Sequence, residues 1–377
     1  MGLRIGIDGR VFIGNKTGIG QYVSELCKAL DDMLPDGEFY VYSRDPVELP
    51  VKKSNWILRT ESFGLLKKMK NILWYKFISG LMCRRDRVDV CWGTGSFLPF
   101  FLGPVNSILT VYDMVYVIAP QTMYKFNLWM FRLFFKRDVR KARRITAISK
   151  GTAERLRDIL DCEVDEIIYP SADKRFIPQS EEAVQSCVAK YGISMPYFLS
   201  VATWEPRKNL RLLLETFLSM KQKKEVSNYQ LVLVGGRGWG DEKIAGIVGN
   251  NIRESGIIPL GYVPDGDLAP LYSGSTAFLF PSIYEGFGMP VLEARKCKVP
   301  VITSDTPELR EAGGDNCIYI QPTAAGIRKG ILHLLNNPQY NLNSEILNPS
   351  WEEGARQMFR VLSEAVSSHE ARSCKVS

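Results

Sequence analysis

Short apolar segments that resemble β-strands recur along this chain and alternate with longer amphipathic stretches. In the first half they are residues 4–8, 39–43, 88–92, 107–113, 144–149 and 166–170. After a polar stretch that begins at Ser171 come residues 197–203, 230–235, 256–263, 277–282, 299–304 and 317–322. Two such series predict two doubly wound α/β domains with parallel sheets. Because these sheets bind ligands at the carboxyl ends of their strands, we expect the active site in the cleft between the domains.

The composition is typical of a globular protein that is long enough for two cores. The chain has 377 residues, of which 45% are hydrophobic and 24% charged. Its eight cysteines form no CxxC pair and its first residues resemble a strand, so we expect free thiols in the cytoplasm and no signal peptide. The net charge of +7 is modest, and without a binding motif it predicts no nucleic-acid partner.

Two stretches in the first half, residues 65–85 and 124–144, mix Lys and Arg with large apolar side chains. The apolar runs are too short to cross a bilayer. At helical spacing, each stretch presents a basic face beside an aromatic one, which suits peripheral docking on an anionic membrane surface. In the alternative, the aromatic rings face the sheet and the cations are only solvated.

The segment PSIYEGFGMPVLEA, residues 281–294, holds two carboxylates on either side of a glycine-rich turn. Pro290 suits the first turn of a helix, which places Glu285 in a loop and Glu293 on that helix. A helix N-terminus between them favours phosphate, and the carboxylates favour hydroxyl groups, as in a nucleotide-sugar. In the alternative interpretation, Glu285 is a solvated residue of a loop and Glu293 is an ordinary exposed acid of the helix.

Two adjacent cations, Arg207 and Lys208, follow the strand at 197–203 and precede an amphipathic helix. A guanidinium binds a diphosphate through two parallel hydrogen bonds, and an ammonium binds it as a point charge. Both offset charge that grows on a leaving nucleotide diphosphate. Solvated cations are the alternative, although the helix dipole disfavours them there.

The loop after the first strand carries Gly18 and Gly20 before a helix expected near Gln21. Val23 stands where a dinucleotide fingerprint has its third glycine, which argues against hydride chemistry. The two glycines allow a ligand close to the backbone, and a plain flexible turn is the alternative.

Asp265 and Asp267 have the spacing of a metal-binding DxD motif. They precede a helix expected from Leu268, so a turn with Asp267 as the N-cap explains them better than a metal site. We expect no metal requirement.

The segments 205–209, 231–241, 261–294 and 301–315 together resemble retaining nucleotide-sugar glycosyltransferases of glycosyltransferase family 4 (group 1), in particular its mannosyltransferase-like bacterial branch. The resemblance implies a GT-B fold, in which two Rossmann-like domains face a central cleft. Residues 1–172 would form the acceptor-side domain and 173–350 the nucleotide-sugar domain. Residues 351–377 would form a helix that returns to the first domain, and a tail.

The resemblance also assigns roles to individual residues. Arg207 and Lys208 match the pair that binds the donor diphosphate, and Glu285 matches the first glutamate of an E-x7-E motif, near the donor sugar. These three are the expected catalytic residues, and Glu293 matches the glutamate that binds the ribose. The other expected donor-binding residues are Gly18, Gly20, Tyr262, Val263, Gly286, Phe287, Gly288 and Met289.

Tyr112 and Asp113 stand where many members of the family have a His-Asp pair, and we assign them to the acceptor side. The two histidines, His333 and His369, fall outside every motif. Front-face retention, in which the leaving phosphate accepts the acceptor's proton, needs no histidine. Asp113 as a strand-end cap is the alternative.

The expected function is metal-independent, retaining transfer of a hexose, in first place mannose from GDP-mannose, to a glycan or lipid-linked saccharide. The resemblance places this in the synthesis of a cell-surface polysaccharide such as lipopolysaccharide, in the cytoplasm or at the inner face of the membrane. UDP-glucose, UDP-galactose and UDP-N-acetylglucosamine remain alternative donors. A nucleotide-sugar 2-epimerase and a non-catalytic sugar-nucleotide-binding subunit are the alternatives from other classes.

Overall fold

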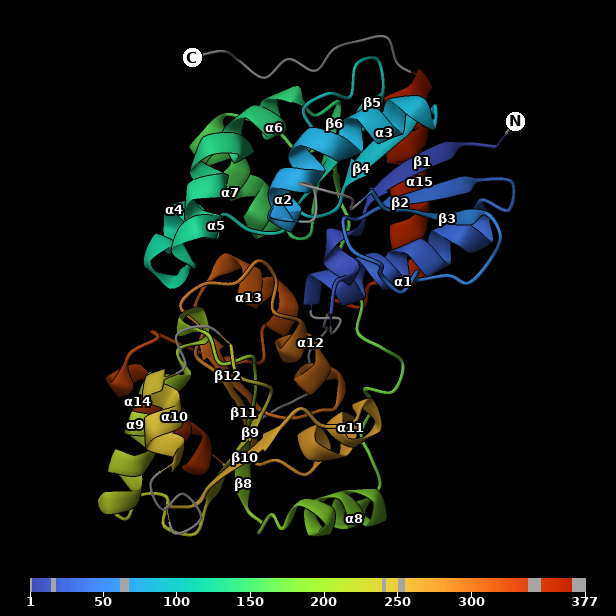
Figure 1. Cartoon of the computed structure of the whole chain (residues 1–377). Helices are drawn as coiled ribbons and strands as arrows, with labels where there is room; N and C mark the ends of the chain where they lie inside the picture. Colours follow the sequence, from blue (N-terminus) through green and yellow to red (C-terminus); the bar gives the residue numbers. More distant parts are fainter. Residues whose placement is uncertain are drawn as a thin grey trace. The chain divides into compact units, whose positions relative to one another are not determined.

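The chain forms two compact α/β units in a computed structural model, which describes residues 2–14, 18–61, 68–238, 242–249, 255–337 and 347–367. Unit 1 comprises Met1–Met114, Trp129–Ser171 and Pro349–Ser377, and unit 2 comprises Val115–Leu128 and Ala172–Asn348. Both units contain a parallel sheet flanked by helices (Figure 1).

The segment Val115–Leu128 belongs to unit 2, although the sequence places it in the first domain. Its residues Val115 and Ala119 form a small apolar cluster with Tyr284, and Met123 packs against that cluster. Burial of these side chains is the physical reason for the difference, because apolar surface removed from water favours the unit that covers it.

The sheet of unit 1 has the order β3-β2-β1-β4-β5-β6-β7. Its strands are β1 (Arg4–Asp8), β2 (Glu38–Tyr42), β3 (Trp56–Arg59), β4 (Val90–Gly93), β5 (Asn106–Val111), β6 (Arg144–Ala147) and β7 (Glu166–Ile167). The sequence analysis missed β3. This short edge strand is buried only at Trp56, which stacks on Phe39 with ring centroids 4.3 Å apart, so it shows little hydrophobic pattern.

The helices of the first half and the last helix lie in unit 1, apart from those that fall in the segment Val115–Leu128 of unit 2. They are α1 (Gly18–Met33), α2 (Asn71–Trp74), α3 (Gly80–Arg85), α4 (Val115–Ile118), α5 (Lys125–Met130), α6 (Lys136–Lys141), α7 (Lys150–Leu160) and α15 (Trp351–Ser367). A π-helical turn, Tyr75–Ser79, joins α2 to α3, and another, Phe131–Phe135, joins α5 to α6. Helix α15 lies in unit 1 and packs against α1, as Figure 1 shows. Residues 368–377 of the expected tail lie outside the described part of the chain.

The sheet of unit 2 has the order β10-β9-β8-β11-β12-β13. Its strands are β8 (Tyr197–Val201), β9 (Gln230–Val234), β10 (Ile257–Gly261), β11 (Ala277–Phe280), β12 (Val301–Ser304) and β13 (Ile318–Ile320). The chain leaves β8 towards β9 and β10, then returns to its other side at β11. The carboxyl ends of β8 and β11 therefore form a topological switch point, which is where such sheets bind ligands.

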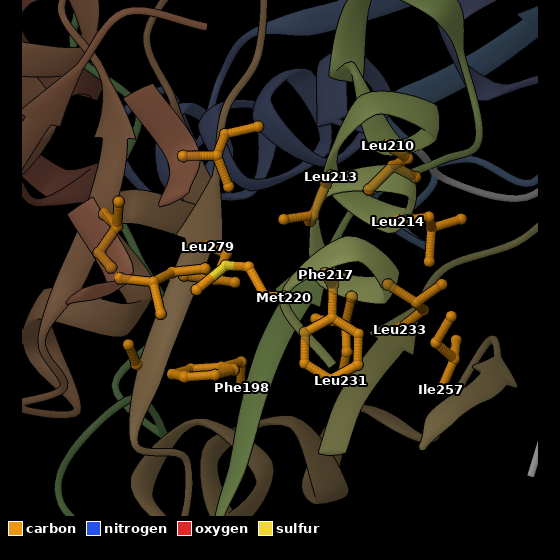
Figure 2. Packing of buried hydrophobic residues seen from close by; sticks show 14 of the residues in the cluster. Phe198, Leu210, Leu213, Leu214, Phe217, Met220, Leu231, Leu233, Ile257 and Leu279 are labelled. Carbon is orange, nitrogen blue, oxygen red and sulfur yellow. The ribbon is translucent and has the colours of Figure 1, made fainter. Parts of the chain in front are cut away.

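Helices α9, α10 and α14 cover one face of this sheet and α11 and α12 the other (Figure 1). The helices of the unit are α8 (Glu181–Tyr191), α9 (Leu210–Gln222), α10 (Glu242–Gly249), α11 (Asp265–Ser273), α12 (Met289–Lys296), α13 (Pro307–Gly313) and α14 (Ala324–Leu335). Figure 2 shows the packed core, in which Leu213, Leu214 and Phe217 of α9 meet Phe198 and Leu231 of the sheet. Burial of each side chain of this size stabilises the fold by about 1.5–3 kcal/mol. This packing fixes α9 and the loop that precedes it.

Most cysteines in the described part of the chain are free thiols, and none of its helices can cross a membrane. Cys27, Cys83, Cys91, Cys187, Cys297 and Cys317 are free and buried. Cys162 is disulfide-bonded, so the expectation of free thiols is wrong at this residue. Within the described ranges, no helix combines the length and the apolarity that a bilayer crossing requires.

Candidate active site

The cations that follow β8 lie on a short 3-10 turn, Pro206–Lys208, between β8 and α9. Asn209 ends the turn with φ of 57°, and its side-chain amide donates to the carbonyl oxygens of Pro281 and Pro322, both at 3.1 Å. The Arg207 carbonyl accepts from the Ile283 backbone at 2.8 Å. These bonds tie the cation-bearing turn to the loop that follows β11.

Arg207, Lys208 and Glu285 meet at this switch point. Arg207 Nη1 donates to Glu285 Oε2 at 2.6 Å and to the Tyr284 carbonyl at 3.0 Å. Lys208 Nζ donates to Glu285 Oε1 at 2.7 Å. Glu285 is 5% exposed, while Arg207 and Lys208 are half-buried. The structure thus brings the three expected catalytic residues into one cluster around a buried carboxylate.

The charges in this cluster stabilise one another. Burial alone would raise the pKa of Glu285, but Arg207 and Lys208 outweigh it and lower that pKa to about 2. Burial lowers the pKa of Lys208, and the Glu285 carboxylate opposes that change. The Glu285 carboxylate is therefore the counter-ion of both cations. Glu285 is not the solvated loop acid of the alternative interpretation.

The glycine-rich turn leads directly into α12, which begins at Met289 with Pro290 in its first turn. This confirms the helix expected near Pro290. Gly288 has φ of 109°, and a Cβ added there would lie 2.6 Å from Leu309 Cδ2. Only glycine fits this backbone without strain. Gly286 and Phe287 are buried between Glu285 and the helix start.

Glu293 lies on α12, as expected, and is half-buried. The Tyr272 hydroxyl donates to Glu293 Oε2 at 2.9 Å. Burial raises the pKa of Glu293 to about 7, against the opposing effects of Tyr272 and Arg175. An ordinary exposed acid would have neither the bond nor the shift. The sequence analysis missed Tyr272, because a buried tyrosine on a helix resembles any core residue.

Tyr262 and Val263 directly follow β10. Tyr262 is 63% exposed, although it is aromatic. A Cβ built on Gly236 would lie 2.1 Å from its ring, so the ring covers the backbone that follows β9. An exposed ring fixed in this way offers a flat surface for stacking.

The glycines of the first loop lie elsewhere than expected. Gly18 and Gly20 form the first turn of α1, in unit 1, so the helix begins before the predicted Gln21. Gly20 is buried, while a Cβ on Gly18 would contact nothing within 4 Å. Neither glycine belongs to an irregular loop in the described part of the chain.

Tyr112 and Asp113 follow β5 in unit 1. Tyr112 is 5% exposed and packs edge-on against Tyr22, with ring centroids 5.8 Å apart. Its hydroxyl has no hydrogen-bond partner among the described residues, and burial raises its pKa. Asp113 is half-buried. Tyr112 thus resembles a core residue more than a surface contact.

The two aspartates with DxD spacing differ from the prediction. Helix α11 begins at Asp265 after Pro264, so Asp267 lies inside its first turn and is not the N-cap. Asp267 accepts a hydrogen bond from Lys190 at 2.6 Å, and Asp265 pairs with Arg175 at 3.0 Å. The described ranges contain no group of three or more His, Cys, Asp or Glu side chains arranged to hold a metal ion.

The part of the chain that contains this site is similar to known glycosyltransferases. Residues 190–357 match the family Glycosyl transferases group 1. O-antigen chain mannosyltransferase B of Escherichia coli is 31% identical over 242 residues, which cover 63% of each chain. O-antigen chain mannosyltransferase RfbU of Salmonella typhimurium is 28% identical over 220 residues, which cover 58% of this chain and 57% of that protein. The chain thus spans less than two thirds of the length of either relative.

Solved structures show the same fold over nearly the whole chain. Sucrose-phosphate synthase from Thermosynechococcus elongatus has a TM-score of 0.72 at 18% identity, covering 96% of this chain and 98% of that chain. WaaG, a glycosyltransferase involved in lipopolysaccharide biosynthesis, has a TM-score of 0.69 at 13% identity, covering 97% and 96%. The fold is GT-B, as expected. The Arg207–Lys208–Glu285 cluster lies within the residues that match the Glycosyl transferases group 1 family.

Proposed function

We propose that the protein is a retaining hexosyltransferase of glycosyltransferase family 4 that moves mannose from GDP-mannose to a saccharide acceptor in cell-surface polysaccharide synthesis. The observation that carries this proposal is the pairing of Arg207 and Lys208 with the buried Glu285 carboxylate at the β8/β11 switch point. The names of its O-antigen chain mannosyltransferase relatives support mannose as the sugar and a saccharide chain as the acceptor.

The cluster fits the electrostatics of the leaving group. As the bond to the sugar breaks, negative charge accumulates on the nucleotide diphosphate, and Arg207 and Lys208 offset it. The diphosphate then takes over from Glu285 as the partner of the two cations, which directs the carboxylate towards the donor sugar. The leaving phosphate accepts the acceptor's proton, so the reaction needs neither a protein base nor a metal.

Thermal unfolding with a panel of nucleotides in chelator tests the donor. A ligand that binds only the folded state raises the melting temperature. We expect GDP and GDP-mannose to raise it and UDP to leave it unchanged. A rise with UDP species alone would replace GDP-mannose by a UDP-hexose, and no rise with any nucleotide would contradict a donor site.

Product analysis tests the reaction class. Incubation with GDP-mannose and a lipid-linked saccharide should yield an α-mannoside, visible in the anomeric region of the proton NMR spectrum. A β-anomer would contradict retention. A changed sugar nucleotide without acceptor would indicate a 2-epimerase, and binding without turnover a non-catalytic subunit.

The peripheral membrane contact has a specific surface in unit 1. Ring contacts connect Phe101, Phe77, Phe100, Phe134 and Trp129 in that order, with centroids 4.9–6.4 Å apart. We call these five residues the aromatic surface. Phe77, Phe101 and Trp129 are 40–54% exposed. Residues 65–67 of the first predicted stretch lie outside the described part of the chain.

A buried ion pair holds the two helical stretches under this surface. Lys76 Nζ lies 2.6 Å from Asp138 Oδ2, and both side chains are 0% exposed. Burial lowers the pKa of Lys76 to about 8, an effect that Asp138 opposes. Lys76 is thus not the solvated cation of the alternative interpretation, whereas Trp74 and Phe135 do face the interior.

Anionic lipid is the partner that suits exposed rings surrounded by basic residues. Arg137 lies over the Phe100 ring at 4.4 Å, and Arg84, Arg132 and Lys136 are exposed residues of the same two stretches. We expect the protein to co-sediment with phosphatidylglycerol vesicles at low salt and the double variant Phe77→Ser, Trp129→Ser to remain in the supernatant. Equal sedimentation of both proteins would contradict this surface.

A further inference from the structure

A tyrosine of α11 holds the carboxylate of Glu293. The Tyr272 hydroxyl donates to Glu293 Oε2 at 2.9 Å, and Tyr272 itself is 0% exposed. Its ring packs edge-on against Phe278 of β11, with centroids 5.2 Å apart, and against Phe176, with centroids 5.9 Å apart. These contacts fix the ring, so the hydroxyl has one position relative to α12.

Phe176 belongs to the segment that enters unit 2 at Ala172, and this segment is fastened to both ends of α11. Arg175 Nη1 lies 3.0 Å from Asp265 Oδ2, at the first residue of the helix. The Gln179 backbone donates to Ser273 Oγ at 3.1 Å, at the last residue of the helix. The segment therefore clamps α11 while Phe176 seats the Tyr272 ring.

Charged and polar groups from three elements face Glu293. Arg175 and Asp173 come from the entering segment, Asp265 and Tyr272 from α11, and Cys297 follows α12 itself. Arg175 and the Tyr272 hydroxyl favour the ionised carboxylate, while Asp173 and Asp265 disfavour it. Removal of the hydroxyl takes away a hydrogen bond to the ionised form, which favours the protonated form.

We propose that Tyr272 is a positioning residue for donor recognition, which holds Glu293 Oε2 so that Oε1 accepts hydrogen bonds from the ribose hydroxyls of the nucleotide-sugar. This inference rests on the proposed function. A carboxylate held by a second residue keeps one rotamer before the ligand arrives, so less freedom is lost on binding. The ribose is remote from the reacting bond, so weaker contact between Glu293 and the ribose should raise KM and leave kcat unchanged.

The variant Tyr272→Phe tests the proposal, because it removes the hydroxyl and keeps the ring. Tyr197→Phe is the matched control. Tyr197 is also 0% exposed in unit 2, and its hydroxyl donates to the carbonyl of Leu271 at 2.8 Å, one residue before Tyr272. Both variants lose one buried tyrosine hydrogen bond, but only the first touches Glu293.

Two measurements separate positioning from general loosening. The first is a pH titration of the Glu293 carboxyl carbon by NMR in the ligand-free protein. The signal of Glu293 is identified by its absence from the spectrum of Glu293→Gln. Tyr272→Phe should raise its pKa by about one unit, the equivalent of one hydrogen bond to a charged group, and Tyr197→Phe should not change it. The second is donor kinetics, in which Tyr272→Phe should raise KM about tenfold with kcat unchanged.

The outcomes distinguish this inference from the proposed function. If Tyr272→Phe and Tyr197→Phe gave the same carboxyl titration and the same KM, Tyr272 would be a structural residue only. If the wild-type protein bound no nucleotide-sugar, the proposed function would fail, and the carboxyl titration would still decide whether Tyr272 positions Glu293. A fall in kcat alone would contradict a role in ribose recognition.

Discussion

Lys208 and Glu285 lie 77 positions apart in the sequence, and their charged atoms lie 2.7 Å apart in the structure. One follows β8 and the other follows β11, the two strands that adjoin at the switch point. The contact shows that the cation site contains its own anion before any substrate binds. A diphosphate that bound Arg207 and Lys208, as we propose, would compete with Glu285 for the same two donors.

Loss of the lysine charge should reduce catalysis. We expect Lys208→Ala to lower kcat/KM for the donor by about 10²–10³-fold, as for removal of one group that stabilises transition-state charge. Lys221→Ala is the control, because Lys221 lies on α9 and donates to the backbone carbonyls of Ser227 and Tyr229, away from Glu285. Initial rates with saturating acceptor measure both. Equal rates for Lys208→Ala and wild type would place the diphosphate elsewhere.

Neutralising the buried glutamate should destabilise the ligand-free protein. Glu285→Gln removes the nearest carboxylate of both Arg207 and Lys208 and leaves Arg207 only its 3.9 Å pair with Glu205, which costs about 3 kcal/mol in the free energy of unfolding. Pyrophosphate should restore more stability to this variant than to wild type, because an anion replaces the lost carboxylate. Urea unfolding with and without pyrophosphate measures this.

The control for that prediction is Glu215→Gln. Glu215 pairs with Arg211 at 2.7 Å on the exposed face of α9, and such surface pairs contribute about 0.3–0.5 kcal/mol. A similar decrease in the free energy of unfolding in both variants would mean that the pairing of Glu285 with Arg207 and Lys208 stabilises the protein no more than a surface ion pair.

Glu293 predicts two opposite pH trends. Its folded pKa of about 7 exceeds the ordinary value of 4.5, so the folded protein keeps a proton that the unfolded chain has already released. The free energy of unfolding should therefore fall as the pH rises from about 4.5 to about 7. Donor affinity should rise as the pH passes through 7, because the ionised carboxylate is the better acceptor.

Glu293→Gln should abolish both pH trends. Chemical unfolding and calorimetric titration with donor compare the variant with wild type. Both are repeated at about pH 5 to 8, a range that spans the raised pKa of Glu293. Parallel pH profiles of the two proteins would show that another group titrates.

The turn before α12 should tolerate no side chain at Gly288. Gly288→Ala forces a Cβ into contact with Leu309 at a backbone angle that L-residues avoid, which should cost about 1–3 kcal/mol and weaken donor binding. Gly266→Ala is the control, since a Cβ on this α11 residue meets nothing within 4 Å. Thermal unfolding and nucleotide titration distinguish them. Full donor affinity in Gly288→Ala would separate the turn from the phosphate site.

The fold was predictable because its strands are buried on both faces and appear as continuous apolar runs. Residues 4–8 were predicted with the observed bounds of β1. Strand β3 was not predictable, since only Trp56 is buried on this edge. The start of α1 was placed too late, because glycines usually interrupt helices and Gly18 and Gly20 instead begin one.

The site was predictable to the level of its residue types. Arg207, Lys208 and Glu285 stood out as charged residues beside buried strands, but their direct contact depends on strand order, which the sequence does not show. Tyr272 and Lys76 were not predictable. Their roles depend on partners from other elements, Glu293 and Asp138, and nothing in their local pattern distinguishes them from a core aromatic residue and a surface lysine.

The packing of Val115 and Ala119 on Tyr284 has a consequence for recombination between relatives. An exchange of C-terminal halves at residue 172 would combine the Tyr284 loop of one enzyme with residues 115–128 of another. That loop continues directly into Glu285, so a mismatch would disturb the very residue that the exchange was meant to transplant. Unit 2 is therefore discontinuous in the sequence, and chimeras that carry residues 115–128 together with 172–348 keep it intact.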